Sequence, residues 1–224
     1  MFIIPCKYIE GKSLIRECVE SIKTHHPDEL IVVVDSNSAD LSYFEYLNQV
    51  SNVVICDKKN SNYIIGALWK AYEMYPNEHH YVLIHDTIII KKPLDKFLQD
   101  EMTYSFLYFD EHPPNTENQA ILDRFILPNY IVPQNTPLIG VWGTAAIFKN
   151  SIVKKFISLN LHNSYLPNNK IECQMSERAL GVLLAKEGID FVTNCVEQKN
   201  CLVHWGSMFD DGFEYIKKTI TIRD

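Results

Sequence analysis

The spacing of apolar and polar residues in the first hundred positions changes repeatedly between two periods. Continuous apolar runs, typical of strands, occupy residues 2–4, 30–34, 53–56 and 81–84. The run at 30–34 is mostly β-branched, as expected of a strand that is buried on both faces. Helical spacing separates several of these runs. We therefore predict a βαβαβ order, which favours a parallel sheet with helices on both faces.

Apolar residues repeat every three or four positions in the two predicted helices of this half. The stripes consist of Ile15, Cys18, Val19 and Ile22 in the first helix, and of Ile65, Leu68, Ala71 and Tyr72 in the second. Such stripes predict helices that bury one face against the sheet. Ser13 precedes the first stripe and is predicted to cap the N-terminus of that helix.

The pattern is less regular after residue 100. Residues 104–109 predict a strand, and residues 110–137 then carry five of the ten prolines without a sustained period. Long irregular segments in compact domains are usually functional or disordered. The apolar residues at 120–127 indicate that part of this segment packs against the domain.

Four further elements are predicted in the second half: a strand at 144–148, a short helix from Ser151, a helix at 176–187 and a last strand at 202–204. We find no internal repeat and no convincing linker. The expectation is one α/β domain spanning residues 1–224. It would have a mostly parallel half at about 1–100, a mixed half at about 101–206, and a C-terminal tail at 207–224 whose role stays open.

Composition narrows the class of protein. Apolar residues make up 46% of the 224 positions, which suffices for a sizeable core, and a net charge of −7 argues against broad binding to nucleic acid. Six cysteines without a Cys-x-x-Cys pair suit a reducing compartment. The chain begins without a basic, signal-like segment and has no apolar run of about 20 residues. We therefore expect a cytoplasmic protein without an integral membrane segment.

Candidate chemistry begins at Asp86, because the apolar strand at 81–84 runs directly into it. Ligands of open α/β sheets bind in the crevice beyond the carboxyl ends of the strands. A carboxylate at that place can hold a divalent cation, which in turn can hold a nucleotide diphosphate. The alternative is an Asp that only shapes the turn after the strand.

Two early segments each combine an apolar strand with a polar turn: residues 2–10 (FIIPCKYIE) and residues 31–40 (IVVVDSNSAD). These segments resemble the family 2-like nucleotide-sugar glycosyltransferases of GT-A fold. The first resembles the opening strand, proline and polar pair of that family, and the second resembles its second strand, which ends in Asp-Asp-Gly-Ser-x-Asp. The resemblance implies that Pro5 lies in the donor site and that Asp35 hydrogen-bonds the nucleotide base. The alternative is that Asp35 and Asp40 shape the turn, and capping of the next helix is the favoured role of Asp40.

The resemblance continues through the next two motifs. Lys59-Asn60 and Gly66-Ala67 stand where the family has Asn-x-Gly and a helix of small residues, and Lys59 either contacts phosphate or is a solvated surface lysine. Residues 81–87 correspond to the strand that ends in the Asp-x-Asp signature. Here His85-Asp86-Thr87 replaces three acids, so only the middle carboxylate is retained.

A metal site is implied by the resemblance at this point. Histidine is a softer ligand than oxygen, which favours Mn²⁺ over Mg²⁺ if a metal binds. His204, at the end of the predicted strand 202–204, is the second expected ligand, because the family brings a late histidine to the metal or the diphosphate. The alternative is a histidine held by a backbone carbonyl. Weak or absent metal dependence is a further expectation of the altered signature.

The acceptor side is implied by two later motifs. The segment from Ser176 to Gly188 resembles the late family helix with an acid at its start, and this makes Glu177 the expected general base of an inverting transfer, with Glu172 as the nearest alternative. A structural role for Glu177 at the helix start is the competing interpretation. In the Gly-rich stretch 140–149, Trp142 and Gly143 are expected to contact the acceptor.

These motifs bring three functions into consideration. The first is transfer of a sugar from a nucleotide-sugar, with a UDP-sugar favoured, to a hydroxyl on a glycan, a lipid-linked acceptor or a protein. The second, a sugar nucleotidyltransferase, is discounted because no early Gly-rich loop with Arg and Lys is present. The third is a non-catalytic module that binds a nucleotide-sugar or carbohydrate. A Rossmann dehydrogenase is excluded because no G-x-G-x-x-G follows the first strand.

Overall fold

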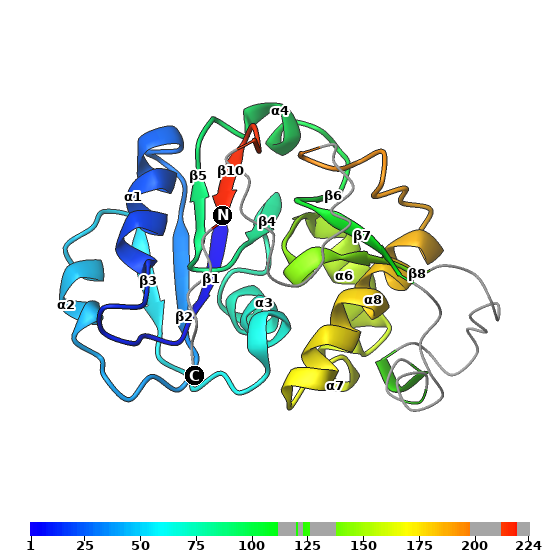
Figure 1. Ribbon diagram of the computed structural model, residues 1–224, viewed down its shortest axis with the longest axis horizontal. Helices are drawn as coiled ribbons and strands as arrows, with labels where there is room; N and C mark the ends of the chain where they lie inside the picture. The colour runs from blue at the N-terminus through cyan, green and yellow to red at the C-terminus, as the bar shows by residue number, and fades with distance from the viewer. Residues whose placement is uncertain (112–119, 121–122, 126–137, 198–211, 219–224) are drawn as a thin grey trace.

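A six-stranded sheet forms the centre of the computed structural model, which describes residues 1–111, 120, 123–125, 138–197 and 212–218 (Figure 1). Its strand order is β3-β2-β1-β4-β9-β6. The strands are β1 (Phe2–Cys6), β2 (Ile31–Asp35), β3 (Val53–Cys56), β4 (His80–Leu83), β6 (Tyr104–Ser105) and β9 (Ala146–Lys149). The first four are parallel to one another, and β9 runs antiparallel to β4 and β6.

Two small sheets accompany the central one. β5 (Ile88–Ile90) pairs with β10 (Ile216–Lys218), and β7 (Tyr108–Glu111) pairs with β8 (Leu138–Val141), both antiparallel. The described helices are α1 (Ile15–His25), α2 (Tyr43–Leu47), α3 (Tyr63–Met74), α4 (Asp95–Leu98), the 3-10 turn η1 (Trp142–Thr144), α6 (Asn150–Ser158), α7 (Leu161–Ser164) and α8 (Lys170–Lys186). This is the mixed α/β architecture that the sequence predicts, and it is consistent with a GT-A-like fold.

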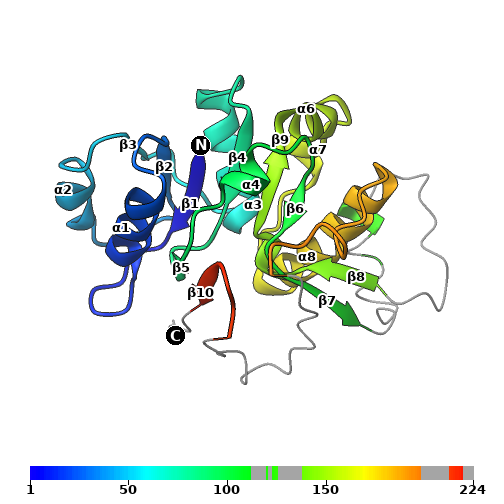
Figure 2. The ribbon, with the colours of Figure 1, turned by 90° about the horizontal axis from the view of Figure 1, so that it is seen from above.

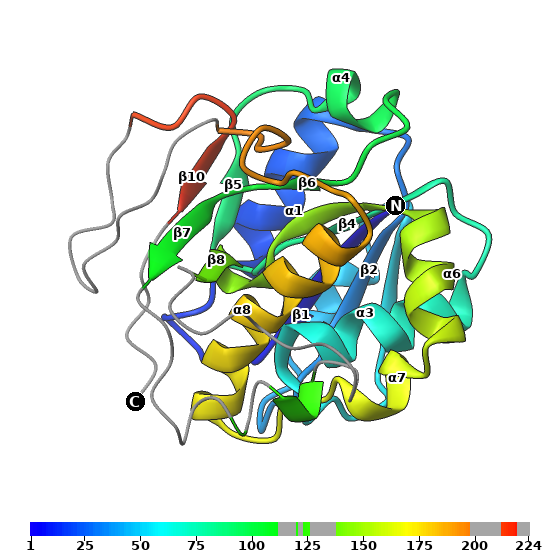
Figure 3. The same cartoon turned by 90° about the vertical axis from the view of Figure 1, so that its right-hand side faces the viewer.

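Two apolar cores lie on opposite faces of the central sheet. Alternate residues of β1 show this directly, because Ile3 packs with α3, α6 and α8 whereas Phe2 and Ile4 pack with α1, α2 and the β5–β10 pair. Figures 2 and 3 show these two layers of helices on either side of the strands. All five residues of β2 are buried, as the β-branched run predicts.

The predicted helical stripe at Ile15, Cys18, Val19 and Ile22 is buried along α1, and the stripe of the second helix faces the other core. The predicted cap is wrong. Leu14 occupies the N-cap position, and the Ser13 hydroxyl instead accepts from the Ile9 amide at 2.8 Å. Ser13 therefore closes the turn before the helix.

Three boundaries in the second half differ from the prediction. The predicted strand at 104–109 divides into β6 and β7, which belong to different sheets. The predicted strand at 144–148 becomes η1 followed by β9. The helix predicted at 176–187 begins at Lys170, because Asn169 caps it by accepting from the Glu172 amide at 2.9 Å. The predicted strand at 202–204 and half of the segment 120–127 lie outside the described residues.

A buried carboxylate holds the C-terminal strand in place. Glu197 is 7% exposed and accepts hydrogen bonds from the amides of Glu214, Tyr215 and Ile216, at 2.6, 2.8 and 2.9 Å. The Lys91 amide donates to the Tyr215 carbonyl at 2.8 Å and extends the pairing of β10 with β5. The C-terminal strand β10 thus joins β5 from the middle of the chain in one small sheet, and β5 packs against α1.

We predict that Glu197→Ala lowers the free energy of unfolding by about 2–3 kcal/mol, because it leaves three backbone amides at β10 without their charged acceptor. Denaturant unfolding measures the change. The matched control is Glu214→Ala, since Glu214 forms an exposed ion pair with Lys92 at 3.1 Å and should contribute little. Equal effects of the two substitutions would contradict a specific role for Glu197.

Candidate functional site

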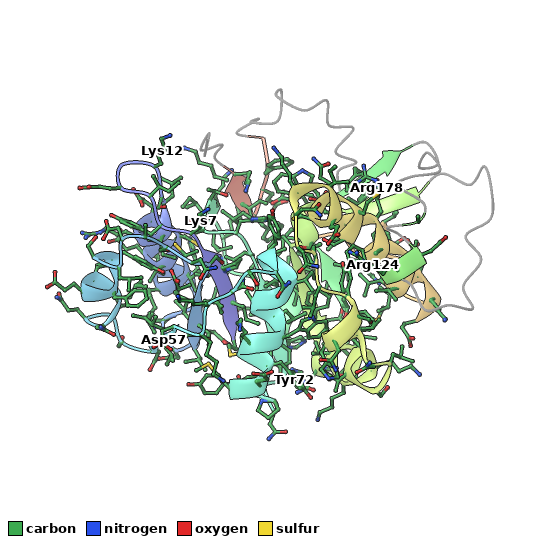
Figure 4. All side chains as sticks on the ribbon, turned by 90° about the horizontal axis from the view of Figure 1, so that it is seen from below. Lys7, Lys12, Asp57, Tyr72, Arg124 and Arg178 are labelled. Carbon is green, nitrogen blue, oxygen red and sulfur yellow. The ribbon has the colours of Figure 1, made fainter. Side chains whose placement is uncertain are left out.

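A pocket of about 420 Å³ opens beyond the carboxyl ends of β1, β2 and β4. Most of its lining residues have polar side chains, and they come from five parts of the chain: Pro5, Lys7, Ser36, Asn37, Asn60, Ser61, Tyr63, Ile64, His85, Asp86, Asn168 and Cys173. The position is the one at which open parallel sheets bind ligands. Figure 4 shows Lys7 on the β1 side of the molecule, with Arg124 and Arg178 on the α8 side.

Two of the predicted site residues, Asp86 and Pro5, line this pocket. Asp86 is only 3% exposed, and the Cys6 thiol lies 3.7 Å from its Oδ2 in hydrogen-bond geometry. Cys6 is the last residue of β1 and Asp86 follows β4, so this contact joins the ends of two neighbouring strands. A carboxylate is thereby fixed at the floor of the pocket.

His85 links the end of β4 to η1. Its Nε2 lies 2.8 Å from the Gly143 carbonyl oxygen, and since a carbonyl only accepts, Nε2 carries the hydrogen. Gly143 has φ 59°, and a Cβ at that position would lie 2.5 Å from Nε2. Glycine is therefore required here both for the backbone conformation and for the approach of the imidazole. The predicted acceptor residue Gly143 is thus a contact of a pocket-lining side chain.

The turn after β2 contributes Ser36 and Asn37 to the pocket. Asp35 is buried and accepts from the Ser38 amide at 3.2 Å and from the Tyr43 hydroxyl at 2.9 Å. Burial above all, with the Asp35 carboxylate among the further causes, raises the pKa of Tyr43, so this hydroxyl remains a donor. These are the contacts of a residue that shapes the turn. A direct contact between Asp35 and a nucleotide base stays a prediction.

Asp40 also acts within this turn, where its Oδ1 accepts from the Ser42 amide at 2.8 Å, just before α2. The predicted capping role of Asp40 is wrong, because Ser42 occupies the N-cap position of α2 and Asp40 holds the turn before it.

Asn60 is a buried amide at the opposite wall of the pocket. Its Nδ2 donates to the Ser36 hydroxyl at 3.2 Å and to the Tyr63 carbonyl at 2.7 Å, and its Oδ1 accepts from the Asn62 amide at 3.1 Å. A Cβ at Gly66 would overlap with Asn60 Oδ1 and would lie only 2.7 Å from the Asn62 Cβ. The small residue in α3 therefore makes room for the amide. The predicted site residue in this motif is the neighbouring Lys59, which is exposed and does not line the pocket.

The two carboxylates of α8 differ in their surroundings. Glu172 accepts from Arg124 at 2.7 Å and from the Asn168 amide at 2.8 Å, and the Arg124 contact, first among the causes, lowers its pKa. Glu177 is half-buried in the middle of the helix, one turn beyond the pocket residue Cys173. Burial raises the pKa of Cys173 to about 12, and the charge of Glu177 adds to this shift.

The helix-start environment predicted for Glu177 is therefore wrong, and Glu172 occupies the first turn of α8 instead. The sequence cue is Asn169-x-x-Glu172, a capping pattern that precedes the stripe used for the prediction. Because α8 packs against β8 and η1, Glu177 belongs to the same side of the molecule as Trp142 and Gly143. The ion pair with Arg124 weakens Glu172 as a base, and Glu177 stays the predicted general base.

Trp142 lies beside the pocket and carries a cation on its ring. Its indole centroid is 6.2 Å from that of His85, and the Lys218 ammonium lies 5.0 Å from the indole centroid. Lys218 also donates to the Thr87 hydroxyl. The sequence pattern assigns no role to residues 207–224. No local pattern around Lys218 indicates this contact, because it depends on the pairing of β10 with β5.

The described residues do not supply a complete set of ligands for a divalent cation. Within these residues, no three His, Cys, Asp or Glu side chains gather at a point where they could hold one. Among the described residues that line the pocket, Asp86 is the only one with a carboxylate. Hard divalent cations prefer several oxygen ligands. The other expected ligand, His204, lies outside the described residues. No helix in the described part of the chain is both long and apolar enough to cross a membrane.

The chain is similar in structure to S. aureus TarS. Residues 1–349 of TarS match with 14% identity and a TM-score of 0.49, over 80% of this chain and 54% of that chain. The same fragment in complex with UDP matches with a TM-score of 0.47 over the same shares. The bifunctional IspDF from Campylobacter jejuni matches with 14% identity and a TM-score of 0.38, over 80% of this chain and 47% of that chain.

This chain therefore spans about half the length of the TarS fragment that it matches. No family model matches the chain, and no curated protein matches it in sequence. Similarities of this strength leave the activity to be argued from the site itself.

We predict that Gly66→Ala weakens ligand binding in the pocket and lowers stability, because the new Cβ displaces Asn60 from its contacts with Ser36 and Tyr63. Thermal unfolding and calorimetric titration with UDP measure the two effects. The control is a double-mutant cycle: Gly66→Ala added to Asn60→Ala should be less harmful than Gly66→Ala alone. Simple additivity would show that Asn60 is not the residue displaced.

Proposed function

We propose that this protein transfers a sugar from a nucleotide-sugar, with a UDP-sugar favoured, to a hydroxyl acceptor. The observation that carries the proposal is the polar pocket at the ends of β1, β2 and β4, with Asp86 at its floor. The motif resemblance at residues 2–10, 31–40 and 81–87 supports the same assignment for the same three strand ends. Hydroxyl and amide side chains that line the pocket suit the hydrogen-bonding groups of a nucleoside and a sugar.

The proposed reaction is a direct displacement. The acceptor oxygen bonds to the anomeric carbon of the donor, the bond from that carbon to the diphosphate oxygen breaks, and the nucleoside diphosphate leaves with the electron pair. Attack from the side opposite the leaving group inverts the configuration at this carbon. Glu177 takes the proton of the attacking hydroxyl, as a half-buried carboxylate on a rigid helix can. Trp142 and Gly143 lie on the acceptor side, and Trp142 offers an aromatic face for a sugar ring.

Each remaining part of the pocket has a role in this proposal. Lys7 is exposed at the pocket and adds positive charge toward the phosphates. The loop of Ser36 and Asn37, held by Asp35, contacts the nucleoside. His85 joins the donor and acceptor sides through Gly143. If Mn²⁺ or Mg²⁺ binds, Asp86 and His204 are the proposed ligands, and the metal would add positive charge at the diphosphate.

The first test is a calorimetric titration of the protein with UDP and with GDP, each in Mn²⁺ and in EDTA. We expect saturable binding of one diphosphate, and the base that binds names the donor class. The control is Asn60→Ala, which removes two donated hydrogen bonds at the pocket wall and should weaken binding. Absence of binding to either diphosphate would contradict the proposal and favour a non-catalytic carbohydrate-binding module.

The second test concerns the general base. Glu177→Gln should retain binding of the nucleoside diphosphate and should slow transfer about a hundredfold or more, because an amide cannot accept the hydroxyl proton. Release of UDP from a UDP-sugar, measured with candidate acceptors, follows the reaction. Glu187→Gln makes the same charge change at the far end of α8 and serves as the control. Transfer that survives Glu177→Gln would exclude Glu177 as the base.

A further inference from the structure

A cation of the C-terminal strand lies at the end of β4, next to the pocket. Lys218 is the last residue of β10, and its ammonium group donates to the Thr87 hydroxyl and lies 5.0 Å from the Trp142 ring centroid. Thr87 directly follows Asp86, and Trp142 lies beside His85. Asp86 and His85 both line the pocket. The ammonium therefore lies where the altered acidic signature meets the acceptor side.

The position of Lys218 is built into the fold. β10 is held by its antiparallel pairing with β5. It is also held by the hydrogen bonds that Glu197 accepts from three backbone amides. Along this strand side chains alternate between faces, so Lys218 is half-buried against Thr87 and Trp142 whereas Lys217 is exposed. A lysine that only increased solubility would be exposed, as Lys217 is.

The charge of Lys218 also acts on a buried thiol near Asp86. Burial is the main cause that raises the pKa of the Cys18 thiol. Asp86 raises this pKa further, and Lys218 opposes that effect. The negative charge of Asp86 and the positive charge of Lys218 thus shift the pKa of the same buried thiol in opposite directions.

We propose that the Lys218 ammonium binds the diphosphate of the nucleotide in place of a divalent cation. The inference rests on the proposed function. The resemblance implies a metal held by several acids at positions 85–87, but only one acid remains there and a fixed cation lies beside it. An ammonium forms charge-assisted hydrogen bonds with phosphate oxygens. The same contact stabilises the negative charge that develops on the leaving diphosphate.

The test is a calorimetric titration of the intact chain with UDP and with uridine, both in EDTA. The native protein should bind UDP without added metal. Lys218→Met should bind UDP about ten- to a hundredfold more weakly, the loss expected for a charge-assisted hydrogen bond. It should bind uridine as the native protein does, because uridine has no phosphate. The uridine titration thus separates a phosphate contact from damage to the pocket.

Lys217→Met is the matched control, because it removes the same charge from the neighbouring position of the same strand. Its affinity for UDP should stay within about twofold of that of the native protein, as for other exposed charges. Thermal unfolding of both variants accounts for any change in stability.

Three results would overturn the role of Lys218 and leave the nucleotide-binding function standing. These are binding of UDP by the native protein only in Mn²⁺, equal UDP affinity of Lys218→Met and the native protein, and an equal loss of uridine and UDP binding in Lys218→Met. Failure of the native protein to bind UDP or GDP under any condition would instead overturn the proposed function, and the role of Lys218 with it.

Discussion

The parallel pairing of β3, β2, β1 and β4 is the constraint on which the site depends. Parallel strands end at the same edge of a sheet, so residues far apart in sequence come together there without any contact between their flanking helices. Pro5, Ser36 and Asp86 meet at one pocket for this reason. The contact of Cys6 with Asp86 and the hydrogen bond from Asn60 to Ser36 then fix the strand ends relative to one another.

The parallel half could be predicted from the sequence because its signals are local. Continuous β-branched runs predict buried strands, and the helical stripe of α1 predicts its buried face; the structure confirms both. The second half was predicted less well. Residues 104–109 have the composition of one strand, but the chain passes from the central sheet to another sheet within them. Propensity cannot show such a change, because it depends on which partner strands are available.

The candidate site divides in the same way. Asp86 and Pro5 were predicted from the local pattern and the motif resemblance near the ends of apolar strands, and both line the pocket. Lys59 was predicted rather than Asn60, because a lysine suggests a phosphate contact whereas the burial of an amide has no signal in the sequence. The contacts of Asn60 and the space provided by Gly66 become visible only when β2 and α3 are packed together. Lys218 could not have been selected, because its partner Thr87 lies 131 positions away in sequence.

The Glu197 carboxylate has a consequence for how the segment around β10 can vary. It accepts hydrogen bonds from the backbone amides of residues 214, 215 and 216, and not from their side chains. This anchor therefore places no requirement on which side chains these residues carry. Substitutions at exposed positions of the segment, such as Glu214 and Lys217, leave the backbone of β10 attached as before.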